Sequence, residues 1–175
     1  MKLDRVCMVT TFYPPWSFGG DAVAVRGLAH ALADEGVEVT VVHCADSYHV
    51  LAGGPPQHEQ ESHPGVRVVP LSGRVPIASP ALTYLTGRPG LKARRLREEI
   101  DSGRFDVTHF HNVSLFGPAV LGIGSGVRVL TLHDHWLVCS MHVLWQDNPE
   151  SAKHRTAPAA SRTSTGHHNH GDGQS

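Results

Sequence analysis

Polar and aromatic side chains stand at the ends of two apolar runs of the chain. The first run covers residues 106–110 and the second covers residues 127–132. The side chains concerned are His109, His111 and Asn112 for the first run, and His133, Asp134 and Trp136 for the second. A β-branched apolar run is typical of a buried strand in a parallel sheet, and the carboxyl ends of such strands open into the ligand crevice. We therefore expect the two groups to form one site.

His133 is the residue of this set that we expect to carry the chemistry. An imidazole can donate a hydrogen bond to a substrate hydroxyl, stabilise a developing charge, or act as a general acid or base near neutral pH. A histidine at a strand end can also simply bond to backbone carbonyls, but Asp134 and Trp136 beside it favour a functional role. Trp136 can stack on a ligand ring or fill a hydrophobic gap, and both interpretations stay open.

The pair His109 and His111 raises the hypothesis of a metal site. Residues i and i+2 of a strand point to the same side, so both imidazoles can reach one zinc ion, with His133 and Asp134 as further ligands. Neither an H-E-x-x-H nor a C-x-x-C motif accompanies the pair, and the sequence contains no G-x-S-x-G nucleophile motif. We therefore predict no metal site, and keep a small metal-dependent hydrolase using these histidines as the alternative function.

Gly19 and Gly20 precede a segment with helical spacing of apolar residues. Without Cβ atoms, the backbone N–H groups at such a position can approach a phosphate, and the helix dipole favours the negative charge. The pair is not the G-x-G-x-x-G fingerprint of dinucleotide-binding proteins. A phosphate-binding loop and a plain tight turn therefore both remain open.

A basic run lies within residues 91–100. It consists of Lys92, Arg94, Arg95 and Arg97, followed by Glu98, Glu99 and Asp101. The basic side chains are compatible with contact to a membrane surface or to an anionic substrate. Salt-bridge spacing to the acidic residues that follow favours a solvated helix face instead.

The apolar pattern predicts the elements that must position these residues. Strands are expected at residues 5–11, 37–43, 67–71, 107–110 and 127–132. Helices are expected at residues 21–35 (with Asp21 as N-cap and Gly36 as the stop), at 91–100, and around 118–123 with a start near Ser114 or Leu115. Residues 52–65 are expected to form a loop. Alternating strands and helices predict an α/β, Rossmann-like, doubly wound parallel sheet.

The bulk composition fits one folded domain with a tail. The chain has 175 residues, 40% of them hydrophobic and 18% charged, and a net charge of −1, which gives no general attraction to nucleic acid. Three cysteines suggest buried thiols in a reducing compartment, and no apolar segment is long enough for an integral membrane helix.

We expect a folded domain over residues 1–146, a low-complexity, disordered tail over residues 147–175, and a cytoplasmic location.

Three segments together resemble the N-terminal half of a family 4 glycosyltransferase with the two-domain GT-B architecture. They read MVTTFYPPWSFGGDAVAVRGLAHALADEGVEVTVV, FDVTHFHN and RVLTLHDHWLVCSMHVLW, and the resemblance runs from Arg5 to Trp145. It implies a retaining transfer of a sugar from a nucleotide-sugar to an acceptor. It also implies no metal and no cofactor besides the nucleotide-sugar as co-substrate.

The resemblance also implies roles for the residues above. Gly19 and Gly20 match the loop that approaches the donor pyrophosphate, and His133 matches the catalytic histidine beside the donor sugar. On the acceptor side, the matching positions are His109, His111, Asn112, Asp134 and Trp136. The implied partners are a nucleotide-sugar donor and a sugar or lipid-linked acceptor, with peripheral contact at the inner face of the membrane as a further expectation.

The donor-binding second domain of that architecture is not found in this sequence. We therefore expect a truncated or frameshifted product that, alone, is inactive or binds only the acceptor, because this chemistry depends on positioning between two lobes. A non-catalytic partner of a separate donor-binding domain is the remaining alternative.

Overall fold

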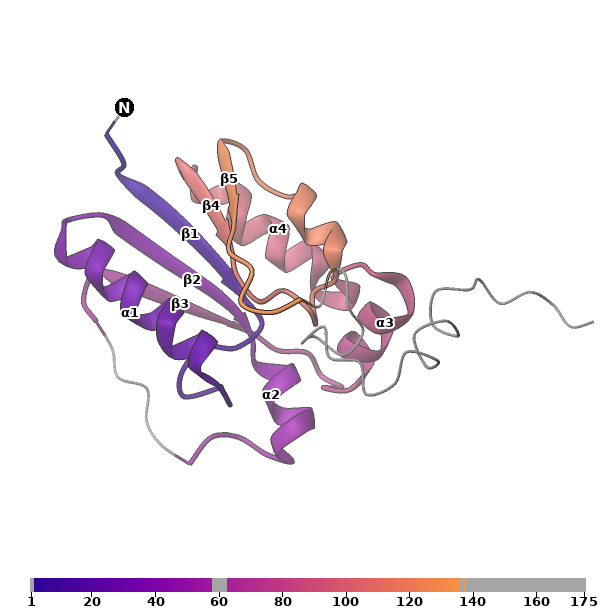
Figure 1. Cartoon of the computed structure of the whole chain (residues 1–175). Coiled ribbons are helices and arrows are strands. Elements are labelled where there is room, and N and C mark those ends of the chain that lie inside the picture. The colour runs from indigo at the N-terminus through magenta and orange to yellow at the C-terminus, as the bar shows by residue number, and fades with distance from the viewer. Residues whose placement is uncertain (1, 58–62, 136, 138–175) are drawn as a thin grey trace, which may run out of the picture. The chain divides into compact units, whose positions relative to one another are not determined.

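The computed structural model describes residues 2–57, 63–135 and 137, all of which belong to one compact unit of the chain. In this part, five parallel strands form one sheet in the order β3-β2-β1-β4-β5 (Figure 1). The strands are β1 (Arg5–Thr10), β2 (Glu38–Cys44), β3 (Val66–Leu71), β4 (Val107–Phe110) and β5 (Val127–Leu130). The predicted Rossmann-like α/β class is therefore confirmed.

Helices connect the strands. They are α1 (Gly20–Asp34), α2 (Ala45–Ala52), α3 (Ala78–Thr86) and α4 (Ala93–Ser102), with short 3₁₀ turns η1 (Gly90–Lys92) and η2 (Pro118–Gly122). The chain leaves β1 towards β2 on one side and returns to place β4 on the other side of β1. The strand order thus reverses beside β1, and in open α/β sheets ligands bind at the carboxyl ends of the strands at such a point.

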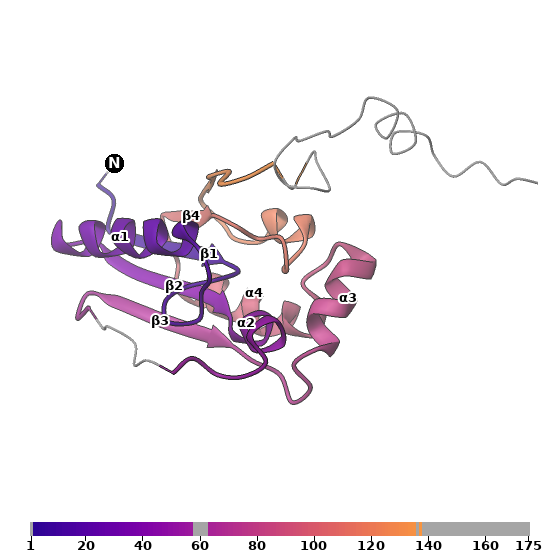
Figure 2. The ribbon, with the colours of Figure 1, turned by 60° about the horizontal axis from the view of Figure 1, so that its bottom comes forward.

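The two faces of the sheet pack against different helices. Val6 and Met8 of β1 pack in one core cluster with Val25 and Ala29 of α1. The alternate residues of the same strand, Cys7 and Val9, belong to a second cluster that includes Leu96 and Ile100 of α4. Figure 2 shows α1 and α4 on these opposite sides. Because both faces are covered, β1 is apolar along almost its whole length.

Some boundaries differ from the predictions. The first helix begins at Gly20 with Gly19 as its N-cap residue, so Asp21 lies in the first turn and is not the cap. Gly36, with φ of 83°, does end this helix. The helices α2 and α3 were not predicted from the sequence, and α2 includes Ala52, the first residue of the expected loop.

The prediction that residues 127–132 form a buried strand is wrong in two respects. The strand β5 ends at Leu130, and all four of its residues are exposed because it lies at the edge of the sheet in the described part of the chain. Cys7 and Cys44 are buried free thiols, as predicted. None of the helices in the described segments is long and apolar enough to cross a bilayer.

Candidate functional site

Three histidines meet at the carboxyl ends of β4 and β5. Parallel pairing sets His109 opposite Val129, so the residues that follow the two strands run on side by side. Nδ1 of His111 lies 3.1 Å from Nε2 of His133, and the rings of His109 and His111 are tilted by 33° with their centroids 4.0 Å apart. The two strand ends that the sequence analysis singled out therefore do come together.

Burial keeps two members of this cluster, His109 and His111, neutral. Desolvation lowers the pKa of His111 to about 3, and the neighbouring His109 and His133 contribute to this lowering. Desolvation, and then His133, also lower the pKa of His109. A neutral imidazole has one N–H and one acceptor nitrogen, so the role of Nδ1 of His111 in its contact with His133 depends on the tautomer of His111.

The cluster keeps one polar atom without a partner. Nε2 of His109 lies 2.8 Å from the hydroxyl oxygen of Thr131. In contrast, Nε2 of His111 is buried and has no hydrogen-bond partner among the described residues. A buried polar atom without a partner costs free energy, and a bound ligand is one way to satisfy it.

Asn112 connects the cluster to the first helix. Its side-chain amide donates to Oδ2 of Asp21 over 2.9 Å, and its own oxygen accepts from the Ser114 hydroxyl over 2.8 Å. Asp21 also accepts the backbone N–H of Ala22 at the start of α1. This contact brings the loop after β4 to the N-terminus of α1, although the two residues are far apart in sequence.

Gly19 and Gly20 lie at this helix N-terminus, and the two differ in the space around them. A Cβ at Gly20 would meet no atom within 4 Å, whereas one at Gly19 would lie 3.1 Å from Oδ1 of Asp21. Neither glycine has a positive φ. The fold therefore does not require glycine at position 20, and the space beside its backbone is open.

The remaining predicted site residues are less defined. Asp134 is partly exposed and has an interaction partner, whereas His133 is exposed. Trp136 lies outside the described residues, as do Cys139 and the whole predicted tail. Within the described ranges, no group of three or more His, Cys, Asp or Glu side chains is arranged to hold a metal ion.

His43 is a residue of this edge that the sequence analysis missed. It is the sixth residue of β2, is 1% exposed, and neither ring nitrogen has a partner in the described part. Burial lowers its pKa to about 4, and its ring packs near Tyr13 and Trp16. The sequence did contain a signal for this residue, because His43 stands at the end of an apolar run, as His109 and His133 do.

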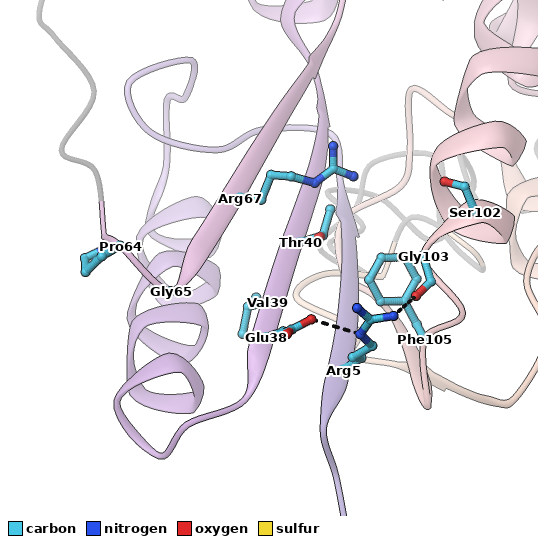
Figure 3. A pocket seen from close by; sticks show the side chains of 10 residues that line it. All are labelled: Arg5, Glu38, Val39, Thr40, Pro64, Gly65, Arg67, Ser102, Gly103 and Phe105. Atoms are coloured by element: carbon cyan, nitrogen blue, oxygen red, sulfur yellow. Dashed lines mark hydrogen bonds and ion pairs between the residues drawn. The ribbon is translucent and has the colours of Figure 1, made fainter.

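A separate hollow of about 380 Å³ lies at the opposite edge of the sheet (Figure 3). It is lined by the first residues of two strands, Arg5 and Glu38, and by Phe105 before β4. Arg5 reaches Glu38 over 2.9 Å and donates to the carbonyl of Gly103 over 3.2 Å. No predicted site residue lines this hollow, and the charged groups of the Arg5–Glu38 pair satisfy each other.

The fold is that of a Rossmann-like α/β domain, and the strand-end cluster is a candidate ligand site at the carboxyl edge of its sheet. The family model described as Glycosyltransferase Family 4 matches residues 18–172. The chain therefore belongs to glycosyltransferase family 4. The match includes every residue of the candidate site and extends past Trp145, where the resemblance noted from the sequence ends. No curated protein matches the chain.

Proposed function

We propose that this chain forms the acceptor side of a retaining glycosyltransferase that uses a nucleotide-sugar donor. Membership of the family supports sugar transfer as the reaction class. The observation that carries the assignment of the site is the contact between His111 and His133, which joins two strand ends beside the switch in strand order.

Each side chain has a role in this proposal. His133 donates a hydrogen bond to the donor sugar at the reacting centre, and His111 holds it in one tautomer and orientation. The neutral state of His111 and His109 suits this role, because a neutral ring can position a sugar hydroxyl without repelling a cation-like transition state. Asn112 and Asp134 are assigned to the acceptor side, and the same role for Trp136, which lies outside the described residues, stays a prediction.

The N-terminus of α1 is proposed to face the donor pyrophosphate. The open space at Gly20 lets a phosphate oxygen approach the first amides of the helix, where the dipole favours negative charge. Asp21, in the first turn, bonds to Asn112 and to a backbone amide, so its carboxylate is already engaged by donors.

The test is binding followed by turnover, with the full chain. Uridine-, guanosine- and adenosine-diphosphate sugars, and simple glycosides as acceptors, are titrated while the imidazole resonances are followed by NMR. We expect an acceptor to shift the resonances of His109, His111 and His133, without release of nucleoside diphosphate by this chain alone. His133→Ala should abolish the response, whereas His49→Ala, at the C-terminal end of α2, should not. A panel that shifts none of the three histidines contradicts the proposed site.

One observation favours a second candidate function, that of a non-catalytic partner of a separate donor-binding domain. The edge strand β5 exposes Val127 and Val129, and Leu132 after it is also exposed. Apolar side chains gathered on a sheet edge are typical of surfaces that another element covers. Dye binding that is lost when a partner domain is added would support this candidate, whereas a monomeric chain that binds no hydrophobic dye would exclude it.

A further inference from the structure

Aromatic side chains gather in the loop between β1 and α1. Four of the seven residues 12–18 are aromatic, whereas only 6% of the whole chain is aromatic. The four are Phe12, Tyr13, Trp16 and Phe18, and the last of them directly precedes Gly19. The roles proposed above for Gly19 and Gly20 involve none of these rings. Rings concentrated directly before a candidate phosphate site point to a part in building that site.

Tyr48 of α2 is the residue against which this loop packs. The ring of Phe18 stacks on that of Tyr48, with the centroids 4.7 Å apart and the planes 21° from parallel. Trp16 meets Tyr48 edge-on at 5.8 Å, and Phe12 meets Phe18 edge-on at 5.5 Å. Aromatic pairs prefer such stacked and edge-to-face arrangements. The four rings therefore form one connected group, which we call the aromatic cluster.

The aromatic cluster lies outside the hydrophobic core. Neither Phe18 nor Tyr48 belongs to the two core clusters of the sheet, and the side chain of Phe18 is 55% exposed. Filling the interior therefore does not account for these two rings. Their contact joins the end of the loop to α2, which are separate elements of the fold.

The backbone at the start of α1 has few other contacts to hold it. Gly19 is the N-cap residue, and no side chain caps this helix with a hydrogen bond. The backbone N–H groups of Phe18 and Gly19 donate to no described residue, whereas Ser17 donates to the carbonyl of Pro15 over 2.9 Å. Donors without a protein partner are available to an anion. They bind it well only where the backbone that carries them is held in place.

The helix α2 provides a fixed support for this part of the loop. Oδ2 of Asp46, in the first turn of α2, accepts the backbone N–H of Gly73 over 2.9 Å and lies 2.6 Å from Nζ of Lys92. The side chains of Asp46 and Lys92 are both buried. These contacts tie α2 to the loop after β3 and to η1. They therefore fix the position of Tyr48, two residues further along the helix.

We propose that Tyr48 is a positioning residue of the phosphate-binding loop. Its ring holds Phe18, and through Phe18 it places the amides of Gly19 and Gly20 where a diphosphate oxygen can approach them. A site whose binding-competent arrangement is populated only part of the time binds with an affinity lowered by that fraction. The inference rests on the proposed function, because it takes the N-terminus of α1 as the place of the donor pyrophosphate.

The test is a titration of the full chain with inorganic pyrophosphate, followed by NMR through the backbone amide resonances of Gly19 and Gly20. Tyr48→Ala should weaken this binding about fivefold, which corresponds to the loss of about 1 kcal/mol from one aromatic pair. Tyr48→Phe keeps the ring and should bind like the unchanged chain. Tyr48→Leu keeps an apolar side chain without a ring and should bind as weakly as Tyr48→Ala. A merely structural role for the side chain would not separate phenylalanine from leucine in this way.

The matched control is Tyr84→Ala in α3, which removes a tyrosine that is 88% exposed. This variant should bind pyrophosphate like the unchanged chain. Urea denaturation of each variant shows that it is folded under the conditions of the titration. Equal affinities of Tyr48→Ala and Tyr84→Ala, or an equal loss in Tyr48→Phe and Tyr48→Ala, overturn the inference.

A second measurement needs no ligand. The NMR order parameters of the Gly19 and Gly20 amides should fall in Tyr48→Ala and stay unchanged in Tyr48→Phe, because only the first variant releases Phe18. If the unchanged chain gives no response to pyrophosphate, the donor side of the proposed function is contradicted and the inference falls with it. If the unchanged chain responds but Tyr48→Ala alters neither the affinity nor the order parameters, the inference alone is overturned.

Discussion

The two edges of the sheet hold their polar groups in different ways. At the amino edge, Arg5 pairs with Glu38, and the carboxylate of Asp106 accepts the backbone N–H groups of Asp4 and Arg5, which lower its pKa. These charges are exposed and satisfied by one another. At the carboxyl edge, several groups are desolvated: His43 and His111 are buried and neutral, and Lys92 and Asp46 form a buried pair.

This difference separates stabilising contacts from a candidate site. An exposed pair gains little free energy, because water and salt screen the attraction between its charges. A desolvated imidazole with an unpartnered nitrogen costs free energy, and ionisable groups perturbed in this way cluster where ligands bind. The comparison therefore supports the carboxyl edge as the functional one, and the following experiments test it.

The largest expected effect is the loss of stability when the buried ion pair at the carboxyl edge is broken, compared with the loss when the exposed pair at the amino edge is broken. Lys92→Ala leaves the Asp46 carboxylate buried without its partner, and should reduce the free energy of unfolding by about 3–5 kcal/mol. Arg5→Ala, at the amino edge, should cost no more than about 1 kcal/mol because both partners are exposed. Urea denaturation of the two variants measures the difference, and equal losses would contradict the distinction between the edges.

The next effect is the pH dependence of stability. Burial lowers the pKa of His111 to about 3 and that of His43 to about 4, against 6.5 for a free imidazole. Below pH 6.5 the unfolded chain therefore binds more protons than the folded chain, so stability is lost as the pH falls. Each histidine should contribute a slope of up to about 1.4 kcal/mol per pH unit between these values.

The variant that tests this slope is His111→Gln. It removes one titrating group, so the free energy of unfolding should fall less steeply between pH 6.5 and about 4.5 than in the unchanged chain. His49→Gln, in the last turn of α2, serves as the control and should leave the slope unchanged. An unaltered slope in His111→Gln would show that this ring is not desolvated.

A smaller effect distinguishes the two glycines of α1 that have open space around them. A Cβ at Gly20 or at Gly27 would meet no atom within 4 Å, so alanine at either position should stabilise the helix by no more than about 1 kcal/mol. Only Gly20→Ala should weaken binding of a nucleotide-sugar, by about tenfold, since the methyl group occupies the space proposed for the phosphate. Thermal unfolding and calorimetric titration separate the two effects, and equal affinities would assign Gly20 to a plain turn.

The smallest expected effect is that of a chelator. If the site works without metal, dialysis against EDTA should change neither the unfolding temperature nor the NMR response of the histidines to an acceptor. Zinc that stays bound in stoichiometric amount to a chain ending at Trp145 would support the hydrolase alternative, because that chain lacks the histidines near the C-terminus.

Much of the fold could be predicted from the sequence, because strands that are buried on both faces of a parallel sheet have nearly continuous apolar sequences. The runs around Met8, Val41, Val69 and Phe110 all became strands of the sheet. The helix α3 escaped prediction because its apolar side chains, Tyr84 and Leu85 among them, face outwards and so give no buried stripe. The exposure of β5 also escaped, since an edge strand and a central strand can have the same apolar sequence.

By itself, the sequence determined the alternation of strands and helices and the polar residue types at the strand ends. These are local properties, set by side-chain periodicity and by the points where apolar runs stop. Only the tertiary structure decided which strands are neighbours. The order β1-β4-β5 brings His111 to His133, and Asn112 to Asp21, across long stretches of chain. Such contacts depend on packing of the whole sheet, and no local pattern encodes them.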